Sequence, residues 1–228
     1  MMTTFRILAV SLSFAVLASP LLRAADLSKY RSFQLGTDLP AVAGLADMSI
    51  AEARVIRQRP ALIQELTWRP QPLGPSAQAE AVKEGIFSFY NGELYRIVIN
   101  YDRYKTEGLT AEDLTAAISA AYGTPDRAAA EIALPTIYGD SETSAVVARW
   151  EDSKQSVNLV RSSYEPSFTL VVLSKRLDAL ARAAATEAIR LDELEAPRRE
   201  IELQKKQEEE NRVQQEKARL ANKPSFRP

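Results

Sequence analysis

Acidic side chains gather at two places in the sequence where they could do chemistry. Glu93, Asp102 and Glu107 lie near the ends of a predicted hairpin, and Asp140 and Glu142 lie in a later polar segment. Paired carboxylates hydrolyse glycosides only at a fixed separation, and calcium takes about six to eight oxygen ligands. The sequence does not show that separation, so we interpret the first group as solvated strand ends. Two carboxylates without EF-hand spacing are too few for calcium, so we interpret the second group as a polar turn. We therefore predict no catalytic residue and no metal site.

The chain has 228 residues, and none of them is cysteine or histidine. Histidine is the commonest general base, and histidine and cysteine are the usual zinc and copper ligands. A Ser-His-Asp triad, a thiol nucleophile and a disulfide are therefore impossible. The eight glycines fall in no phosphate-binding spacing, and we expect no cofactor.

Tyrosine and arginine side chains around the hairpin are the candidates for a binding surface. Both residue types are enriched at the positions that dominate the energy of protein interfaces. With one leucine, the candidate contact residues are Tyr90, Leu94, Arg96, Arg103 and Tyr104. The competing interpretation is core packing, above all for Tyr95 and Tyr101.

The hairpin that positions these side chains spans residues 84–104. Two apolar runs flank Asn91-Gly92, the pair most typical of a tight hairpin turn. A two-residue loop would leave both faces mixed, whereas a three-residue loop gathers apolar side chains on one face, so we predict the latter. Its apolar face would hold Phe87, Phe89, Tyr95, Ile97, Ile99 and Tyr101. Its polar face would hold Ser88, Leu94, Arg96 and Asn100.

Residues 1–25 predict export from the cytoplasm. Arg6 supplies a short positive region, residues 7–22 are mainly apolar, and Ala24 and Ala25 are the small residues expected at a cleavage site. The apolar run is shorter than the roughly 20 residues of a spanning helix. We expect a cleaved signal peptide, with an uncut anchor as the alternative. After cleavage we expect no integral membrane span and a periplasmic or secreted protein.

Residues 26–196 predict an α+β domain in which an antiparallel sheet is packed by two or three helices. Its two α-β halves cover about 33–104 and 110–174, and a docking helix follows at 176–196. Beside this helix, others are predicted after Thr37-Asp38, at Ser49 to Glu52 and from Thr110 to Gly123. Beside the hairpin, strands are predicted at 55–56, 62–68, 144–151, 155–161 and 167–174. Residues 124–143 are a long loop or hide a strand near 132–138.

Residues 197–228 predict a charged helical tail. Pro197 should stop or kink the preceding helix, and the segment from Arg198 to Ala221 favours a helix that is polar on all sides. Its sparse apolar residues, Ile201, Leu203, Val213 and Leu220, keep no heptad. We therefore predict a solvated helix rather than a coiled coil.

The order of a helix, a strand pair with a tryptophan and further strands occurs twice, first with Trp68 and then with Trp150. Over about residues 33–174 this layout resembles the tandem α-β repeats of β-lactamase inhibitor proteins and small outer-membrane assembly lipoproteins. The resemblance implies a binding protein without catalytic residues, although the lipidated cysteine and the disulfides of those families are missing. The segments FYNGELYRIVINYDRYKTEGLT and ARWEDSKQSVNLVRSSY and the tail also look like a family of uncharacterised secreted bacterial proteins, which implies no function.

These features together predict an exported, non-catalytic envelope protein that binds or scaffolds a protein partner through the sheet face or residues 198–228. One alternative is a hydrolase of envelope material that uses carboxylates or a Ser/Lys pair, and another is a protein that binds a small ligand. The chain carries 29 basic and 30 acidic residues, for a net charge of −1. Such a balance gives no electrostatic reason to expect nucleic acid as a partner.

Overall fold

The structure is a computed structural model, and it describes residues 26–70, 81–126, 131–135, 141–161, 167–224 and 227. The predicted export segment and Asp140 lie outside these residues, and so does the side chain of Glu142.

One antiparallel sheet of eight strands forms the centre of the molecule. Its order is β3-β4-β5-β6-β10-β9-β8-β7, so that four consecutive strands form each half and β6 pairs with β10 where the halves meet. The strands are β3 (Arg54–Arg57), β4 (Ile63–Trp68), β5 (Val82–Tyr90), β6 (Glu93–Tyr101), β7 (Glu131–Pro135), β8 (Ser141–Glu151), β9 (Gln155–Arg161) and β10 (Phe168–Ser174). The predicted strands are thus present, and β7 is the strand suspected within residues 124–143.

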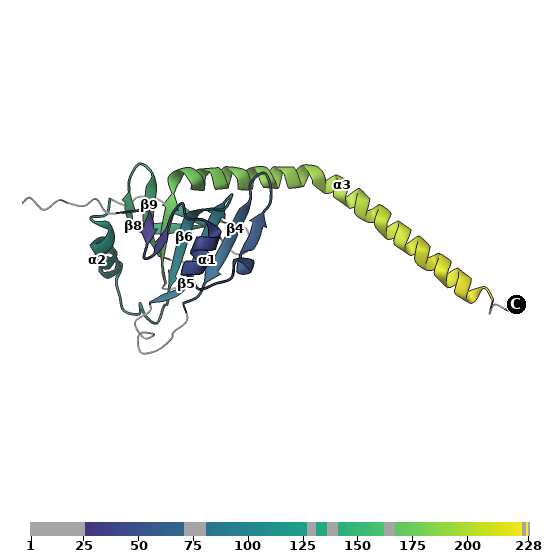
Figure 1. The fold of residues 1–228 in the computed structure, drawn as a ribbon, viewed down its shortest axis with the longest axis horizontal. Coiled ribbons are helices and arrows are strands. Elements are labelled where there is room, and N and C mark those ends of the chain that lie inside the picture. The colour runs from purple at the N-terminus through teal and green to yellow at the C-terminus, as the bar shows by residue number, and fades with distance from the viewer. Residues whose placement is uncertain are drawn as a thin grey trace, which may run out of the picture.

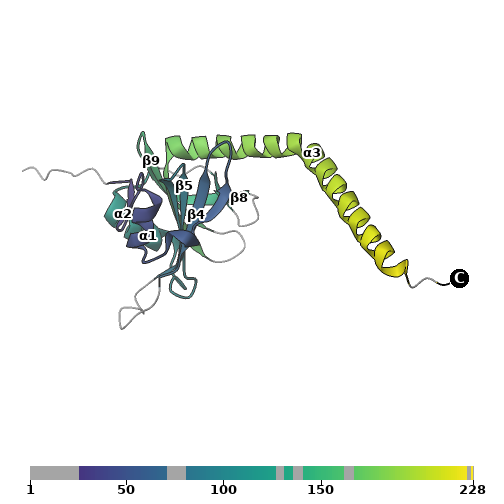
Figure 2. The ribbon, with the colours of Figure 1, turned by 45° about the vertical axis from the view of Figure 1, so that its right-hand side comes forward.

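One helix precedes each set of four strands. The helices are α1 (Leu39–Leu45), the 3-10 turn η1 (Ile50–Glu52), α2 (Ala111–Tyr122) and α3 (Lys175–Asn222). Figures 1 and 2 show α1 and α2 on the same side of the sheet. We call the described residues of 26–174 the head, and α3 runs away from it. The α+β fold and the twofold order of helix and strands are confirmed, whereas the family resemblance stays a prediction.

The predicted helix starts are also confirmed. Asp38 accepts a hydrogen bond from the Ala41 amide at 2.9 Å, which satisfies one of the unpaired donors at the start of α1. Thr110 and Asp113 form a reciprocal capping box at the start of α2. These local contacts explain why both helices begin where the sequence indicates.

The main core lies between the sheet and the two helices that precede its halves. Trp150 is fully buried there, and its indole N–H donates to the carbonyl of Gly123 at 2.8 Å. Trp68 packs edge-on against Phe33, with ring centroids 5.5 Å apart. Both tryptophans therefore fill the core, as predicted.

A short ribbon that the sequence did not indicate closes one end of this core. It consists of β1 (Lys29–Tyr30) and β2 (Phe33–Gln34), and the side chains of Tyr30 and Phe33 are buried. Strands of two residues are too short to show a period-two alternation, so the segment reads as polar from sequence alone.

The predicted three-residue hairpin loop is wrong. Tyr90 pairs with Glu93 across a two-residue loop, in which Asn91 (φ 49°) and Gly92 (φ 86°) adopt the left-handed conformation of a type I′ turn. The next pairs are Phe89 with Leu94 and Ser88 with Arg96, which leaves Tyr95 as the extra residue of a β-bulge.

The bulge separates apolar from polar side chains on the two faces of the hairpin, which was the reason for predicting a three-residue loop. Phe87, Phe89, Ile97 and Ile99 share the core face, as predicted, and Tyr101 packs against it. Leu94 joins that face, whereas Tyr95 turns to the opposite face and packs against Leu177 and Ala181 of α3. Burial thus selects a register with separated faces, and a β-bulge rather than a longer loop provides it.

Tyr122 gives a pH dependence of stability that can be measured. Burial raises the pKa of this hydroxyl to about 12, and the hydroxyl donates to the carbonyl of Lys29 at 2.6 Å. Because an unfolded chain loses this proton near pH 10, the unfolded state is increasingly favoured as the pH rises from 10 to 12. We expect Tyr122→Phe to flatten this decline, measured as urea midpoints from pH 9 to pH 12. Equal slopes for both proteins would contradict the assignment.

Candidate functional site

Helix α3 divides into a docked half and a projecting half. Leu177, Ala181, Ala184 and Ala188 form a buried stripe at helical spacing, which packs on the sheet face opposite α1 and α2. Among the described residues, the ion pair to the head that lies farthest along α3 joins Glu195 to Arg59, through two hydrogen bonds of 2.7 and 2.5 Å. The docking helix predicted for residues 176–196 is therefore the first half of a longer helix.

Every residue from Ala196 to Pro224 is exposed, and we call the helical part, residues 197–222, the arm. Pro197 does not end α3, because the helix continues to Asn222. Figures 1 and 2 show that α3 changes direction partway along its length, as expected where a proline removes a backbone donor. The arm is thus a solvated extension of α3, in line with the predicted charged helical tail.

A buried ion pair fixes the docked half. Arg96 (6% exposed) donates through Nε to Oδ1 of Asp178 (1% exposed) at 2.9 Å, and its Nη2 also bonds this oxygen. The other carboxylate oxygen pairs with the exposed Arg182 at 2.8 Å. Two charges that are removed from water need such complete pairing. Arg96 is therefore used to hold α3 on the sheet.

The structure separates the five predicted contact residues. Leu94 lies in the main core, Arg96 is covered by α3, and Tyr90 packs between the two small clusters beneath α3. Only Arg103 and Tyr104 remain exposed and close together. The polar hairpin face is likewise not open, since Ser88 is buried as well. One sequence signal could have indicated that Arg96 is buried, because Asp178 lies among the apolar residues of the docked stripe and needs a cationic partner there.

Of the three predicted carboxylates, Glu93 lies far from Asp102, whereas Glu107 follows Asp102 by only five positions. Glu93 begins β6 and Asp102 follows its last residue, so the two are roughly 30 Å apart at about 3.3 Å per residue. Asp102 accepts the backbone N–H groups of Tyr104 at 2.8 Å and Lys105 at 3.2 Å, which closes the turn after β6. Among the described residues, no group of three or more acidic side chains is placed to hold a metal ion.

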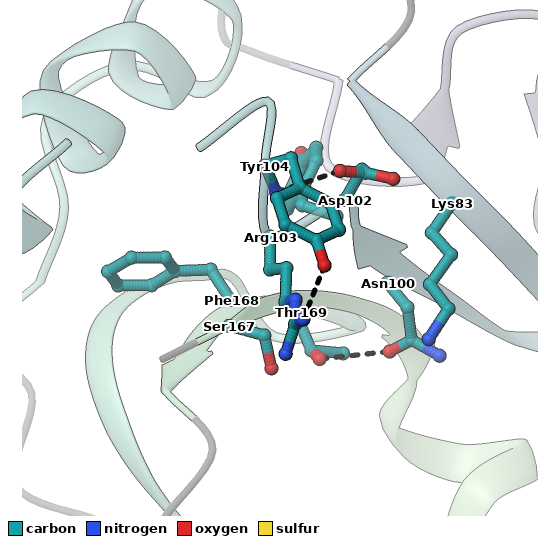
Figure 3. Close-up of a pocket in the computed structure, with 9 residues that line it drawn as sticks. Lys83, Asn100, Asp102, Arg103, Tyr104, Ser167, Phe168 and Thr169 are labelled. Atoms are coloured by element: carbon teal, nitrogen blue, oxygen red, sulfur yellow. Dashed lines mark hydrogen bonds between the residues drawn. The ribbon is translucent and has the colours of Figure 1, made fainter. Parts of the chain in front are cut away.

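Two adjoining hollows lie beyond the end of β6, where Arg103 and Tyr104 are found. Their volumes are about 330 and 380 Å³, and both are lined by Arg103, Tyr104 and Phe168. The first hollow, shown in Figure 3, is also lined by Lys83, Asn100, Ser167 and Thr169. We call the first the basic hollow. It contains a serine and a lysine, but Figure 3 shows Ser167 and Lys83 on different sides of it. These two side chains are therefore not placed next to each other as a Ser/Lys pair.

Comparisons of the chain with protein-family models, curated proteins and solved structures return no match. The family resemblance, the activity class and the localisation consequently stay predictions. Within the described parts of the chain, no helix is both long and apolar enough to cross a membrane.

Proposed function

We propose that the protein is an exported, non-catalytic envelope protein that binds or scaffolds a protein partner, and that the arm is its partner-binding segment. The observation that carries the proposal is a helix whose second half is exposed on all sides. At 1.5 Å per residue the arm is roughly 40 Å long, which is far longer than packing against the head requires.

The arm has a charge pattern that stabilises a helix without tertiary packing. Opposite charges alternate at four-residue steps along Arg198, Glu202, Lys206 and Glu210. Further pairs three residues apart join Arg212 to Glu209 at 2.7 Å and Arg219 to Glu216 at 2.5 Å. Each pair adds only about 0.2–0.5 kcal/mol, but together they support a helix that presents fixed rows of charge. Such rows suit a protein partner with complementary charges.

The non-catalytic part of the proposal rests on the chemistry that the chain lacks. With no histidine and no cysteine, the commonest general base and the thiol nucleophile are missing. Of the carboxylates that the sequence indicated for hydrolysis, Glu93 lies at the opposite end of β6 from Asp102, and Asp102 is bound within its own turn. A binding role needs none of these groups.

Removing the arm should abolish partner capture without destabilising the head. We expect a chain that ends at Ala196 to melt within about 2 °C of the full chain, because surface changes away from packed groups cost little. Crosslinking and pull-down from a periplasmic extract should recover a partner with the full chain and lose it with the shortened chain.

A charge-inverted arm is the matched control. Exchanging every Glu of residues 198–219 for Lys, and every Lys or Arg for Glu, keeps the length and the alternating pairs but reverses each row of charge. We expect this variant to keep its helix content by circular dichroism and to lose the partner. Capture of no partner by the full chain, or equal capture by all three proteins, would contradict the proposal.

A further inference from the structure

The basic hollow lies on the head, at the end of the sheet face where β5, β6 and β10 run side by side. Its polar lining is ordered by hydrogen bonds. The hydroxyl of Thr169 donates to Oδ1 of Asn100 at 2.9 Å, and Nδ2 of Asn100 donates to Glu84 at 3.1 Å. These bonds fix the amide of Asn100 beside the hydroxyl of Thr169.

Two cations reach this polar lining, Lys83 from β5 and Arg103 from the turn after β6. Figure 3 shows the ammonium of Lys83 beside Asn100 and the guanidinium of Arg103 pointing toward Thr169. Arg103 is held in place by its neighbour, because its carbon Cζ lies 4.5 Å from the centre of the Tyr104 ring and its Nη2 donates to the Tyr104 hydroxyl. A guanidinium fixed in this way loses less entropy when it binds an anion.

Asp102 is the one acidic residue among those that line the basic hollow, and its carboxylate closes the turn after β6. The carboxylate of Asp102 accepts the N–H groups of Tyr104 and Lys105, and Figure 3 shows it on the side away from Ser167 and Thr169. The polar bottom of the hollow therefore combines two cations with hydroxyl and amide groups, which is the chemistry that binds a carboxylate or a phosphate.

The second hollow offers a less polar surface next to these cations. It is lined by Leu109, which is 46% exposed, by Gly108, and by the charged residues Arg161 and Glu107, whereas Phe168 at its edge is buried in the main core. A ligand that fills both hollows would therefore place an anionic group in the first and a ring against Tyr104 and Leu109. Pockets of this size suit small organic molecules.

We infer that the two hollows together bind a small organic anion, with its carboxylate or phosphate between Lys83 and Arg103 and its ring against Tyr104 and Leu109. This site is separate from the arm and does not rest on the proposed protein partner.

Three probes are tested on the full-length protein: benzoate, phenyl phosphate and the neutral benzamide. They ask whether the ligand must be negatively charged and whether its anionic group is a carboxylate or a phosphate. We expect at least one of the two anions to bind by calorimetry and by NMR shifts at Lys83, Arg103 and Tyr104, and benzamide to bind at least tenfold more weakly. The preferred anion tells whether the site takes carboxylates or phosphates.

Lys83→Gln and Arg103→Gln should each weaken binding of the preferred anion about tenfold, as expected for the loss of one charge-assisted hydrogen bond. Both residues are exposed, so that these variants should fold. Arg212→Gln on the arm removes the same charge far from the site and should leave the affinity unchanged. The inference is overturned if neither anion binds, if benzamide binds as well as the anions, or if all three variants behave alike.

Discussion

Replacement of Asp178 by alanine is expected to destabilise the protein by about 3–5 kcal/mol, the usual cost of leaving a buried charge without its partner. Arg96 lies beneath α3 and cannot reach water without undocking the helix. A loss of this size should lower the melting temperature by roughly 6–20 °C for a chain of this length. Urea unfolding followed by circular dichroism provides the measurement.

Two further variants separate the buried pair from a general effect of mutation on α3. Arg182→Ala removes the exposed partner of the same carboxylate and should cost about 1 kcal/mol or less. The double variant Arg96→Met/Asp178→Leu replaces the pair by apolar groups of similar size and should regain most of the stability. If Asp178→Ala were no more harmful than Arg182→Ala, the pair would not be the contact that holds α3.

The ion pair also bears on the proposed function, because it helps to set where the arm leaves the head. Apolar contacts between alanines and a sheet tolerate small shifts of a helix, whereas a guanidinium bonded to one carboxylate oxygen through two nitrogens fixes its position. The buried pair therefore gives the docked half of α3 a defined place, from which the arm projects.

The sequence predicted those elements whose signals are local. Thr110, Asp113 and Gly123 delimit α2 through backbone hydrogen bonds that involve only neighbouring residues, and Asn91-Gly92 fixes the hairpin turn in the same way. The β-bulge at Tyr95 could not be predicted from local signals of this kind. It is favoured because Leu94 fits the main core and Tyr95 fits under α3, and both environments are made by distant parts of the chain.

The candidate site was predicted less well than the fold, for the same reason. Arg96 and Arg103 look alike in sequence, as arginines beside tyrosines in one hairpin. They differ because Asp178, more than 80 positions later in the chain, covers the first, and because the turn after β6 leaves the second exposed beside β10. Long-range packing decides which polar side chains reach solvent, and a single sequence does not state it.

Leu94→Ala is expected to cost about 2–5 kcal/mol, although the sequence placed this residue on a binding surface. Leu94 is 0% exposed within the main core. Its backbone also anchors the segment before α1, since its carbonyl accepts the N–H of Gly36 at 2.8 Å and its N–H donates to Thr37 at 2.9 Å. The alanine variant keeps those backbone bonds, so that the measured loss reports the side chain.

Tyr104→Ala is the matched comparison, because this residue belonged to the same predicted surface but is 69% exposed. We expect a change in the free energy of unfolding of about 0.5 kcal/mol or less for Tyr104→Ala, from urea titrations at neutral pH. Leu94→Ala should not alter anion binding in the basic hollow under conditions where it is folded, since it lies at the opposite end of β6. A Leu94→Ala protein as stable as the parent would place this side chain on the surface and restore the original prediction.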